Sequence, residues 1–163
     1  SRIGEQGEGF KIAMHSLDQG RFTVAAGAVG VVRACLEASV KYANERQTFG
    51  QQIGKYQFVQ DMIADMVLGY ETSKLLVMKA AWKKNTGERN TKETSLAKWH
   101  ATESAFDAAN KAIQVHGAYG YSAEYPVERY FRNSRAPIIY EGTTQIHKMM
   151  QAEHALGYRK LNG

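Results

Sequence analysis

The chain has 163 residues, of which 44% are apolar and 23% charged, and its formal net charge is +5. This length and balance predict one globular domain with a hydrophobic core and exclude an intrinsically disordered chain. The single cysteine, Cys35, excludes an intramolecular disulfide framework and favours a reducing compartment. The positive charge comes with neither a nucleic-acid-binding motif nor a long basic run, so we expect no nucleic-acid partner, and we also expect no membrane span.

The first helix is predicted over residues 21–45, where apolar side chains recur at helical spacing. The preceding residues, 1–17, hold three glycines and few hydrophobic anchors. We therefore interpret residues 1–17 as a segment that leads in from a preceding domain, and residues 18–163 as one helical domain. The apolar stripe of the first helix consists of Val24, Ala28, Val31, Cys35, Ala38 and Tyr42.

A second helix is predicted over residues 55–84, with Gly87 as its stop signal. Asn90 followed by Glu93 resembles a capping box, which predicts that a third helix begins near residue 91. Small residues on one side of this third helix would let a neighbouring backbone approach closely. The second stripe is Val59, Met62, Ile63, Met66, Tyr70, Ser73, Val77 and Ala81, and the third is Ala101, Ala105, Ala108 and Ala112.

Both prolines, Pro126 and Pro137, follow residue 120, so the preceding chain is free to form long helices. Two glycines near residue 120 end the third helix, a short element is expected at 127–134, and a last helix is expected at 143–156. Alternating strand-like runs are nearly absent. The predicted fold is therefore all-α, an antiparallel (up-and-down) helical bundle of three long helices plus shorter C-terminal helices.

The histidines do not show the spacing of metal ligands. Helical bundles with a two-metal centre use Glu-x-x-His on two helices, and this sequence contains no such motif. Isolated histidines are more often packing or surface residues, and we expect no metal. The five histidines are His15, His100, His116, His147 and His154.

Glu141 is a single carboxylate between an apolar run and a glycine, in the stretch IIYEGTTQI. One reading is structural: a carboxylate just before a helix is stabilised by the unpaired N–H groups there, with Thr143 or Thr144 as N-cap. The other reading is functional: an apolar wall raises the proton affinity of a carboxylate and suits it to act as a general base. The local sequence leaves both readings open.

Longer segments place this glutamate in a wider pattern. Four of them resemble the acyl-CoA dehydrogenase family, most closely its medium-chain and short-chain types, and follow the family's usual order. The resemblance covers the C-terminal helical domain of that family and neither its N-terminal helical domain nor its central β domain. The segments are LDQGRFTVAAGAVG (17–30), YANERQTFGQQI (42–53), AIQVHGAYGY (112–121) and YPVERYFRNSRAPIIYEGTTQI (125–146).

The resemblance implies a flavin-dependent dehydrogenation of an acyl-CoA thioester to the trans-2-enoyl-CoA, a step of fatty acid β-oxidation. Glu141 matches the family's base, which removes the α-proton while hydride passes to FAD. Its backbone N–H matches a donor to the thioester oxygen, and Gly142 would let thioester and flavin approach closely. Asp18 and Arg21 match residues near the CoA-binding cleft. An aspartate that only caps a helix, followed by an arginine in the first helical turn, would give the same sequence pattern.

The resemblance also bears on where the base lies. In the isovaleryl type, the base stands just before the arginine of an Asp-x-x-Arg segment, on a different helix. Here that segment is DQGR and the position is Gly20. The resemblance therefore leaves Glu141 as the candidate base.

Residues far apart in the sequence match FAD contacts of the family. One segment, RQTFG, matches a part that reaches across a dimer interface towards the neighbour's cofactor, although by itself it would fit a helix C-terminus with a glycine stop. Ala118 stands where the common family form has a second adjacent glycine. The matched cofactor contacts are Arg46, Thr48, Phe49, Gln57, Gln114, Gly117, Ala118, Thr143 and Gln145.

Two kinds of function remain open. The first is the C-terminal domain of a straight-chain acyl-CoA dehydrogenase, with an electron-transferring flavoprotein as acceptor and a homotetramer or dimer of dimers as the full-length assembly. An acyl-CoA oxidase-like enzyme is a rival within this class. The second is a helical oligomerisation module, and we expect this chain alone to bind FAD weakly and to turn over little acyl-CoA. The expected compartment is the mitochondrial matrix or the bacterial cytoplasm.

Overall fold

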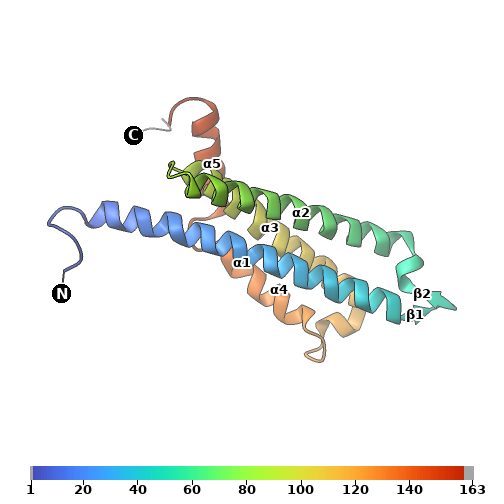
Figure 1. Ribbon diagram of the computed structural model, residues 1–163. Coiled ribbons are helices and arrows are strands. Elements are labelled where there is room, and N and C mark those ends of the chain that lie inside the picture. Colours follow the sequence, from blue (N-terminus) through green and yellow to red (C-terminus); the bar gives the residue numbers. More distant parts are fainter. Residues whose placement is uncertain (1, 160–163) are drawn as a thin grey trace.

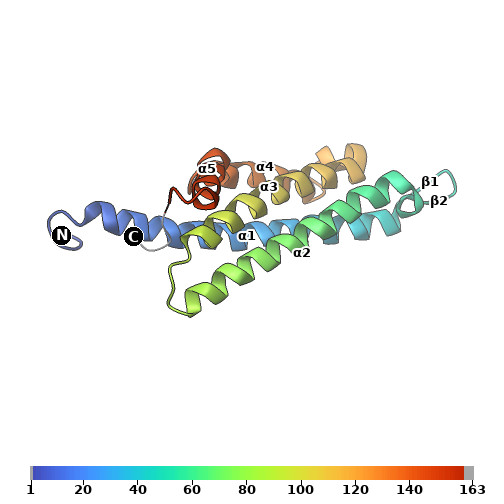
Figure 2. The ribbon, with the colours of Figure 1, turned by 90° about the horizontal axis from the view of Figure 1, so that it is seen from above.

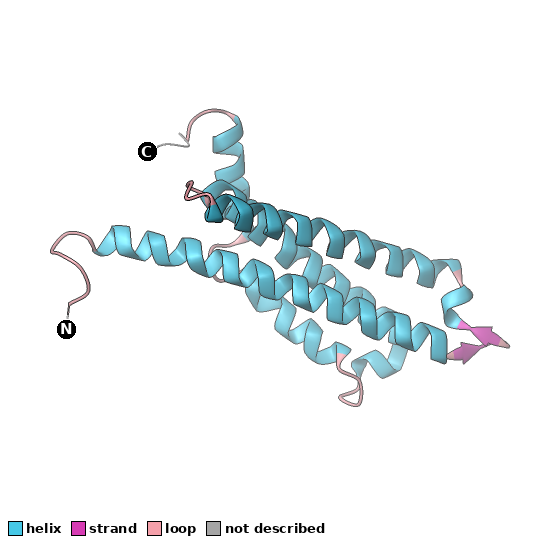
Figure 3. Cartoon of the chain, viewed as in Figure 1, coloured by secondary structure: helices cyan, strands magenta, loops and turns pink. Residues whose placement is uncertain are grey.

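The computed structural model describes residues 2–159, and helices make up nearly all of its regular structure (Figures 1 and 3). This confirms the predicted all-α class, with three long helices followed by two short ones; residues 160–163 of the predicted domain lie outside the described part. The α-helices are α1 (Gly9–Glu45), α2 (Gln57–Asn85), α3 (Thr91–His116), α4 (Val127–Arg135) and α5 (Thr144–Ala155). The other elements are strands β1 (Gln47–Thr48) and β2 (Gln51–Gln52) and the 3-10 helices η1 (Ile53–Lys55), η2 (Gly117–Tyr121) and η3 (Ala136–Ile138).

Consecutive long helices run antiparallel, so that α1 and α3 point in the same direction, and the three pack pairwise (Figure 1). Helices α4 and α5 pack against α3 on the side away from α2, so that α1 and α3 form the middle of the domain (Figure 2). One face of α2 is consequently left uncovered by the rest of the described chain. The turn between η3 and α5 comes back to α1, and this brings residues from both ends of the sequence together.

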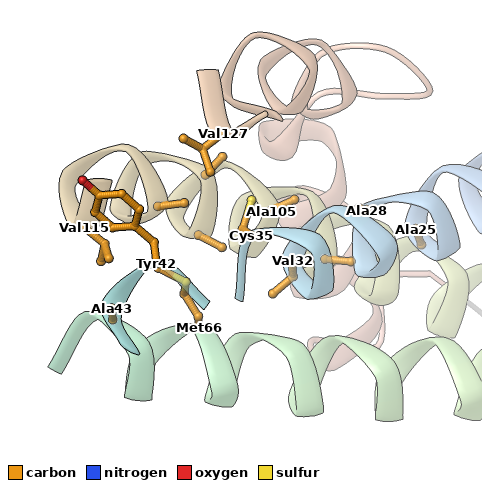
Figure 4. Packing of buried hydrophobic residues seen from close by; sticks show 14 of the residues in the cluster. Ala25, Ala28, Val32, Cys35, Tyr42, Ala43, Met66, Ala105, Val115 and Val127 are labelled. Carbon is orange, nitrogen blue, oxygen red and sulfur yellow. The ribbon is translucent and has the colours of Figure 1, made fainter. Parts of the chain in front are cut away.

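Small side chains let α1 and α3 approach closely (Figure 4). The predicted alanine stripe of α3 is confirmed, because its four alanines are each at most 2% exposed. Val32 and Cys35 on α1 and Met66 on α2 fill the space beside them. Interiors of this density resist enlargement, and one extra branched side chain in such a stripe costs about 1–3 kcal/mol. Burial also raises the pKa of the Cys35 thiol to about 12, as expected of an unreactive core cysteine.

Helix α1 is longer than predicted. It begins at Gly9 rather than near residue 21, and its first turns project beyond the bundle (Figure 1). The boundary drawn between residues 17 and 18 therefore falls inside a helix. The segment from Phe10 onward contains no proline and no cluster of turn residues, so nothing interrupts the helix there. Asp18 is thus an interior residue, and the interpretation of this aspartate as an N-cap is wrong.

By length and composition, α1 also meets the criterion for a membrane span that the sequence analysis did not expect to be met. An 18-residue window of this helix has a mean hydropathy of 1.4. In the fold, the same helix carries Ala25, Val32 and Cys35, all fully buried against the other helices. In total 28% of that window is buried, so one side of α1 packs against the bundle.

A small hairpin follows α1, where the sequence pattern shows no strands. Strands β1 and β2 pair antiparallel, with Gln47 opposite Gln52 and Thr48 opposite Gln51. The two residues between the strands, Phe49 and Gly50, have φ of 50° and 80°. Left-handed φ at both positions is the geometry of a two-residue hairpin turn. The segment RQTFG is therefore not an ordinary helix C-terminus, because the helix ends at Glu45 and a hairpin begins two residues later.

The connection between α2 and α3 confirms one predicted signal and contradicts another. Gly87 has a φ of 76° and its N–H donates to the carbonyl of Lys84 at 3.1 Å, as expected of a helix stop. Asn90 is the N-cap residue of α3, but its side chain makes no capping hydrogen bond and donates to the carbonyl of Ala80 instead. Glu93 pairs with Lys83 at 3.2 Å. The capping box therefore does not form, because both side chains have tertiary partners.

Candidate active site

The segment that carries Glu141 is a tight turn between η3 and α5. Pro137 lies in the first turn of η3 and Ile138 is buried, so the chain is anchored just before the turn. Glu141 and Gly142 both have a left-handed backbone, with φ of 56° and 95°. This conformation is uncommon for a residue with a side chain. Thr143 is the N-cap residue of α5, close to the predicted helix start, although its side chain makes no capping hydrogen bond.

The carboxylate of Glu141 lies against α1. A β-carbon at Gly20 would be 2.6 Å from Cδ and from each carboxylate oxygen of Glu141. Oε2 is buried and has no hydrogen-bond partner within residues 2–159. A buried carboxylate oxygen without a partner is costly, and in native proteins such groups often have a catalytic role. The side chain therefore differs from a solvated glutamate at a helix start.

Two further predicted residues support this turn from α1. Arg21 Nε donates to the carbonyl oxygen of Glu141 at 3.2 Å, and Arg21 Nη1 pairs with Asp18 Oδ1 at 3.1 Å. Thr91 Oγ1, at the start of α3, donates to the other Asp18 oxygen at 2.7 Å. Asp18 and Arg21 thus connect the start of α3 with the Glu141 turn, and both side chains are largely buried.

Lys98 and His147 complete the surroundings of the turn, and the sequence analysis did not select either as a site residue. Both are fully buried. Lys98 Nζ donates to the carbonyl oxygen of Gly142 at 2.7 Å, and His147 Nδ1 is hydrogen-bonded to Ser95 Oγ at 2.9 Å. Burial, together with the charge of Arg21, lowers the pKa of Lys98 to about 8. Burial and the charges of Lys98 and Arg21 lower the pKa of His147 to about 4, so this imidazole is neutral at pH 7.

A signal for Lys98 was present in the sequence. Lys98 is three residues before Ala101 and seven before Ala105, so it lies on the core-facing stripe of α3. A lysine at such a position is rarely fully buried without a partner, and this makes it a candidate for a specific role. His147 gave no comparable signal, because a single histidine on an amphipathic helix is ordinary.

Gly142 has an internal reason to be glycine. A β-carbon there would lie 3.1 Å from His147 Nε2, and the φ of 95° disfavours any side chain. The space that a side chain would need is therefore on the buried side of the turn, towards His147. From the family resemblance, glycine was expected here because of the close approach of thioester and flavin.

A groove begins next to the turn and follows α1. Its volume is about 370 Å³, and Tyr140 lies at the end near Glu141. The α1 residues that line it include Val24, Gly27 and Val31, which are on the same side of the helix as Gly20. The groove is mostly apolar and open to solvent, so an extended apolar chain could lie along it.

Five of the predicted cofactor contacts gather at the other end of the domain. A hollow of about 280 Å³ lies where α1 and α3 end. Its lining includes the guanidinium group of Arg46, the hydroxyl group of Thr48 and the side-chain amide of Gln114. Phe49 is at the tip of the neighbouring hairpin and is 99% exposed, while Gln57 begins α2; neither lines the hollow. The five predicted residues that line it are Arg46, Thr48, Gln114, Gly117 and Ala118.

The remaining predicted contacts, Thr143 and Gln145, line a different hollow of about 380 Å³ at the start of α5. Glu103 and Arg135 line the same hollow, and Thr144 Oγ1 donates to the carboxylate of Glu103. Between Glu103, which lines this hollow, and Gln114, which lines the other, α3 rises about 17 Å. The structure thus divides the predicted cofactor residues into two groups, one beside the middle of α3 and one at its C-terminal end, and does not bring them together.

Among the described residues, no group of three or more His, Cys, Asp or Glu side chains could hold a metal ion. His100 bonds to Thr72, and His116 Nδ1 lies 2.8 Å from the carbonyl of Ala112. Burial lowers the pKa of both imidazoles. These two histidines are packing residues of the bundle.

Comparison with known proteins places this geometry in a family context. Residues 7–156 match the family described as acyl-CoA dehydrogenase, C-terminal domain. The chain is 45% identical over 150 residues to the caffeyl-CoA reductase-Etf complex subunit CarC of Acetobacterium woodii, which covers 92% of this chain and 40% of that protein. It is 44% identical over 154 residues to the mitochondrial short-chain specific acyl-CoA dehydrogenase of Rattus norvegicus, covering 94% of this chain and 37% of that protein.

A solved structure gives the same result for the fold. The structure of butyryl-CoA dehydrogenase from Megasphaera elsdenii superposes with a TM-score of 0.91 at 42% sequence identity, over 94% of this chain and 40% of that one. The chain therefore spans about two fifths of the length of the relatives that it matches.

Proposed function

Because this chain belongs to the acyl-CoA dehydrogenase family, whose C-terminal domain it matches, we propose that it supplies the base for the dehydrogenation of an acyl-CoA thioester to the trans-2-enoyl-CoA. Glu141 is the base. One observation carries the proposal: the carboxylate of Glu141 lies against Gly20 with a buried oxygen that no described residue satisfies. This geometry suits an acceptor for a substrate proton.

The backbone of the same residue supports the proposal. The carbonyl oxygens of Glu141 and Gly142 are bonded by Arg21 and Lys98, whereas the N–H of Glu141 has no acceptor in the described part of the chain. A free N–H beside the base can donate to the thioester oxygen as the α-proton leaves and negative charge develops there. The base and the oxyanion donor would then belong to one residue.

The groove along α1 suits the acyl chain of the substrate. It begins at Tyr140, next to the base, and its lining on α1 is apolar. Asp18 and Arg21 do not line the groove, and their charged pair beside the turn suits the polar CoA part of the thioester. A straight-chain acyl-CoA fits this arrangement, with its acyl chain in the apolar groove and its polar CoA part near the charged pair.

The two groups of predicted cofactor residues suit different parts of FAD. A bound FAD would supply the acceptor for the hydride that leaves the β-carbon. Arg46, Thr48 and Gln114 offer a cation and neutral donors that fit a phosphate and its adjoining ribose. At the start of α5, the hollow that contains Thr143 is lined by both Arg135 and Glu103, so it offers a cation for a phosphate and an acceptor for hydroxyl groups.

The proposal assigns the two groups of residues to two separate cofactor molecules. In this proposal, each domain holds one FAD near the base and reaches the FAD of a neighbouring subunit with the hairpin end. The assembly is then a homo-oligomer, a dimer of dimers or a tetramer. An electron-transferring flavoprotein is the proposed electron acceptor, in keeping with the Etf complex named for one relative. A mitochondrial matrix or a bacterial cytoplasm is the proposed location.

The variant Glu141→Gln tests the proposal in the FAD-containing enzyme that includes this chain. The amide keeps the shape of the side chain but cannot accept the proton, so anaerobic flavin reduction by a saturated acyl-CoA should slow by at least about 100-fold. Binding of the enoyl-CoA product should remain. Glu124→Gln, at an exposed glutamate of the preceding loop, is the control and should keep the normal rate. A normal rate in Glu141→Gln would remove Glu141 from the role of base.

A second function is favoured by the outer face of α2. Leu68, Leu75, Met78 and Trp82 lie on one side of this helix and are each 58–65% exposed. Apolar side chains gathered in this way mark a protein interface. The domain is therefore also an oligomerisation module, and this role does not depend on FAD.

A further inference from the structure

Lys98 is a fully buried charged side chain to which the proposed reaction gives no role. Lysines are almost never fully buried unless they are paired. No carboxylate oxygen lies within 4.0 Å of Lys98 Nζ anywhere in residues 2–159. The acceptor of its ammonium is the carbonyl oxygen of Gly142, at 2.7 Å. An apolar side chain would fill the same space beside Ala97 and Ala101 without the cost of burying a charge.

The surroundings of Lys98 disfavour the charged form of its side chain. Burial lowers the pKa of the ammonium most, and the charge of Arg21 lowers it further, while the carboxylates of Glu141 and Glu103 oppose both effects. The neighbouring imidazole of His147 is held neutral at pH 7 by the same burial. The ammonium is therefore kept in an unfavourable place by one strong hydrogen bond.

That hydrogen bond fixes the part of the turn next to the base. Glu141 and Gly142 have φ of 56° and 95°, and for Glu141, which has a side chain, this conformation persists only where the surroundings hold it. Arg21 from α1 holds the first carbonyl and Lys98 from α3 holds the second. With both carbonyls turned inwards, the N–H of Glu141 is left free and its carboxylate lies against Gly20.

We propose that Lys98 is a positioning residue: by anchoring the carbonyl of Gly142 it holds the left-handed turn in which Glu141 presents both its carboxylate and its N–H to the thioester. This inference rests on the proposed function of Glu141. Lys98 touches neither the substrate nor the cofactor and takes no proton from them. Its effect is on the geometry of residues 141 and 142.

The anchoring can be measured without any catalytic assay. Gly142–Thr143 is the single Gly–Thr pair in the sequence, so labelling with [1-¹³C]glycine and [¹⁵N]threonine gives one carbonyl–amide NMR cross-peak for the whole chain. In the wild type, the ¹³C shift of this carbonyl should change with a midpoint near pH 8, where Lys98 titrates. In Lys98→Met the peak should move and this transition should be absent. A carbonyl shift that is unaffected by the pH and by the substitution would overturn the inference.

The catalytic consequence is measured in the FAD-containing enzyme. Lys98→Met should lower the rate of flavin reduction by about 100-fold, because a displacement near 1 Å at a catalytic group has this effect, while KM changes little. Lys98→Gln, which keeps a neutral donor, should recover part of the rate and serves if Lys98→Met does not fold. Lys111→Met on the same helix removes a lysine paired with Asp65 and is the matched control, with a normal rate expected.

The outcomes separate this inference from the proposed function. If Glu141→Gln abolishes flavin reduction while Lys98→Met and Lys98→Gln both keep the normal rate, only the positioning role fails. If Glu141→Gln keeps the normal rate, the proposed base fails, whereas the NMR result still decides whether Lys98 anchors the turn. A loss of rate in Lys98→Met equal to that in Lys111→Met would indicate a general structural effect and would overturn the inference.

Discussion

The carboxylate of Glu141 occupies the space in which a β-carbon of residue 20 would lie. The two residues are far apart in the sequence, and the turn before α5 brings them together across α1. A β-carbon at Gly20 would be 2.6 Å from three atoms of the carboxyl group, closer than non-bonded atoms approach. Gly20 is therefore required by the side chain that it faces, and its own backbone is helical.

We expect Gly20→Ala to move the carboxylate of Glu141 while leaving the fold intact. The atoms that must yield are the end of a flexible side chain, and alanine is favoured over glycine inside a helix by about 0.5–1 kcal/mol. Flavin reduction in the FAD-containing enzyme should therefore slow by about 100-fold, with no loss of thermal stability. Gly30→Ala, on the same helix with open space around it, is the control and should keep the normal rate. A normal rate in Gly20→Ala would mean that the carboxylate works from another position.

Acidic pH should destabilise the chain through His147. Its pKa is about 4 in the fold against 6.5 for a free imidazole, so between these values the unfolded chain binds more protons than the folded one. Stability therefore falls as the pH is lowered from 6.5 to 4, by up to about 3 kcal/mol from this residue. In His147→Gln, which keeps a side-chain amide near Ser95, urea unfolding should depend less on pH over this range. His100 and His116 also have lowered pKa values and should supply the dependence that remains. Equal slopes in both proteins would contradict the assignment.

The sequence pattern predicted the class of the fold because helical periodicity depends on which side chains must be buried. The stripes that contain Cys35, Met66 and Ala105 identified three helices whose inward faces the structure confirms. The start of α1 was misplaced because its first turns project beyond the bundle and bury few side chains, so periodicity gave no signal there. The β1–β2 hairpin was missed because strands of two residues are too short for an alternating pattern.

The site was predictable only in part. Family resemblance selected Glu141, Asp18 and Arg21, and the structure brings these three together. His147 was missed because a single histidine on an amphipathic helix is ordinary, whereas Lys98 was missed although its place on the core-facing stripe of α3 marked it. The carbonyl that Lys98 binds is 44 positions away, and its place on the stripe does not encode which group it contacts.

Gly120→Ala should destabilise the domain much more than most glycine substitutions. A β-carbon at this position would lie 2.5 Å from the carbonyl oxygen of Ile113 and 2.8 Å from its Cα. These atoms belong to the backbone of α3, which cannot move aside as a flexible side chain can. We expect a loss of about 2–4 kcal/mol in the free energy of unfolding, measured in urea, against no loss in Gly30→Ala. If Gly120→Ala unfolds at the same urea concentration as the wild type, η2 can shift away from α3 at little cost.

The outer face of α2 should control self-association. Leu68, Leu75, Met78 and Trp82 form an apolar stripe on the side of the helix opposite to Met66, which is buried in the bundle. A second copy of the chain is the expected partner, so placing like charges in this stripe, as in Leu68→Glu with Leu75→Glu, should lower the molar mass measured by light scattering. The monomer should keep its helical circular dichroism, because neither side chain contributes to the core.

A control for this last prediction is available on another helix. Leu156, just after α5, is 63% exposed, as Leu68 is, but it lies outside the stripe. Leu156→Glu introduces a charge of the same sign, one per chain where the double variant introduces two, and should leave the molar mass unchanged. If Leu156→Glu and the double variant reduce the mass equally, added negative charge rather than the α2 stripe governs association. If neither does, copies of the chain meet through a different surface, and the stripe is left to contact another partner.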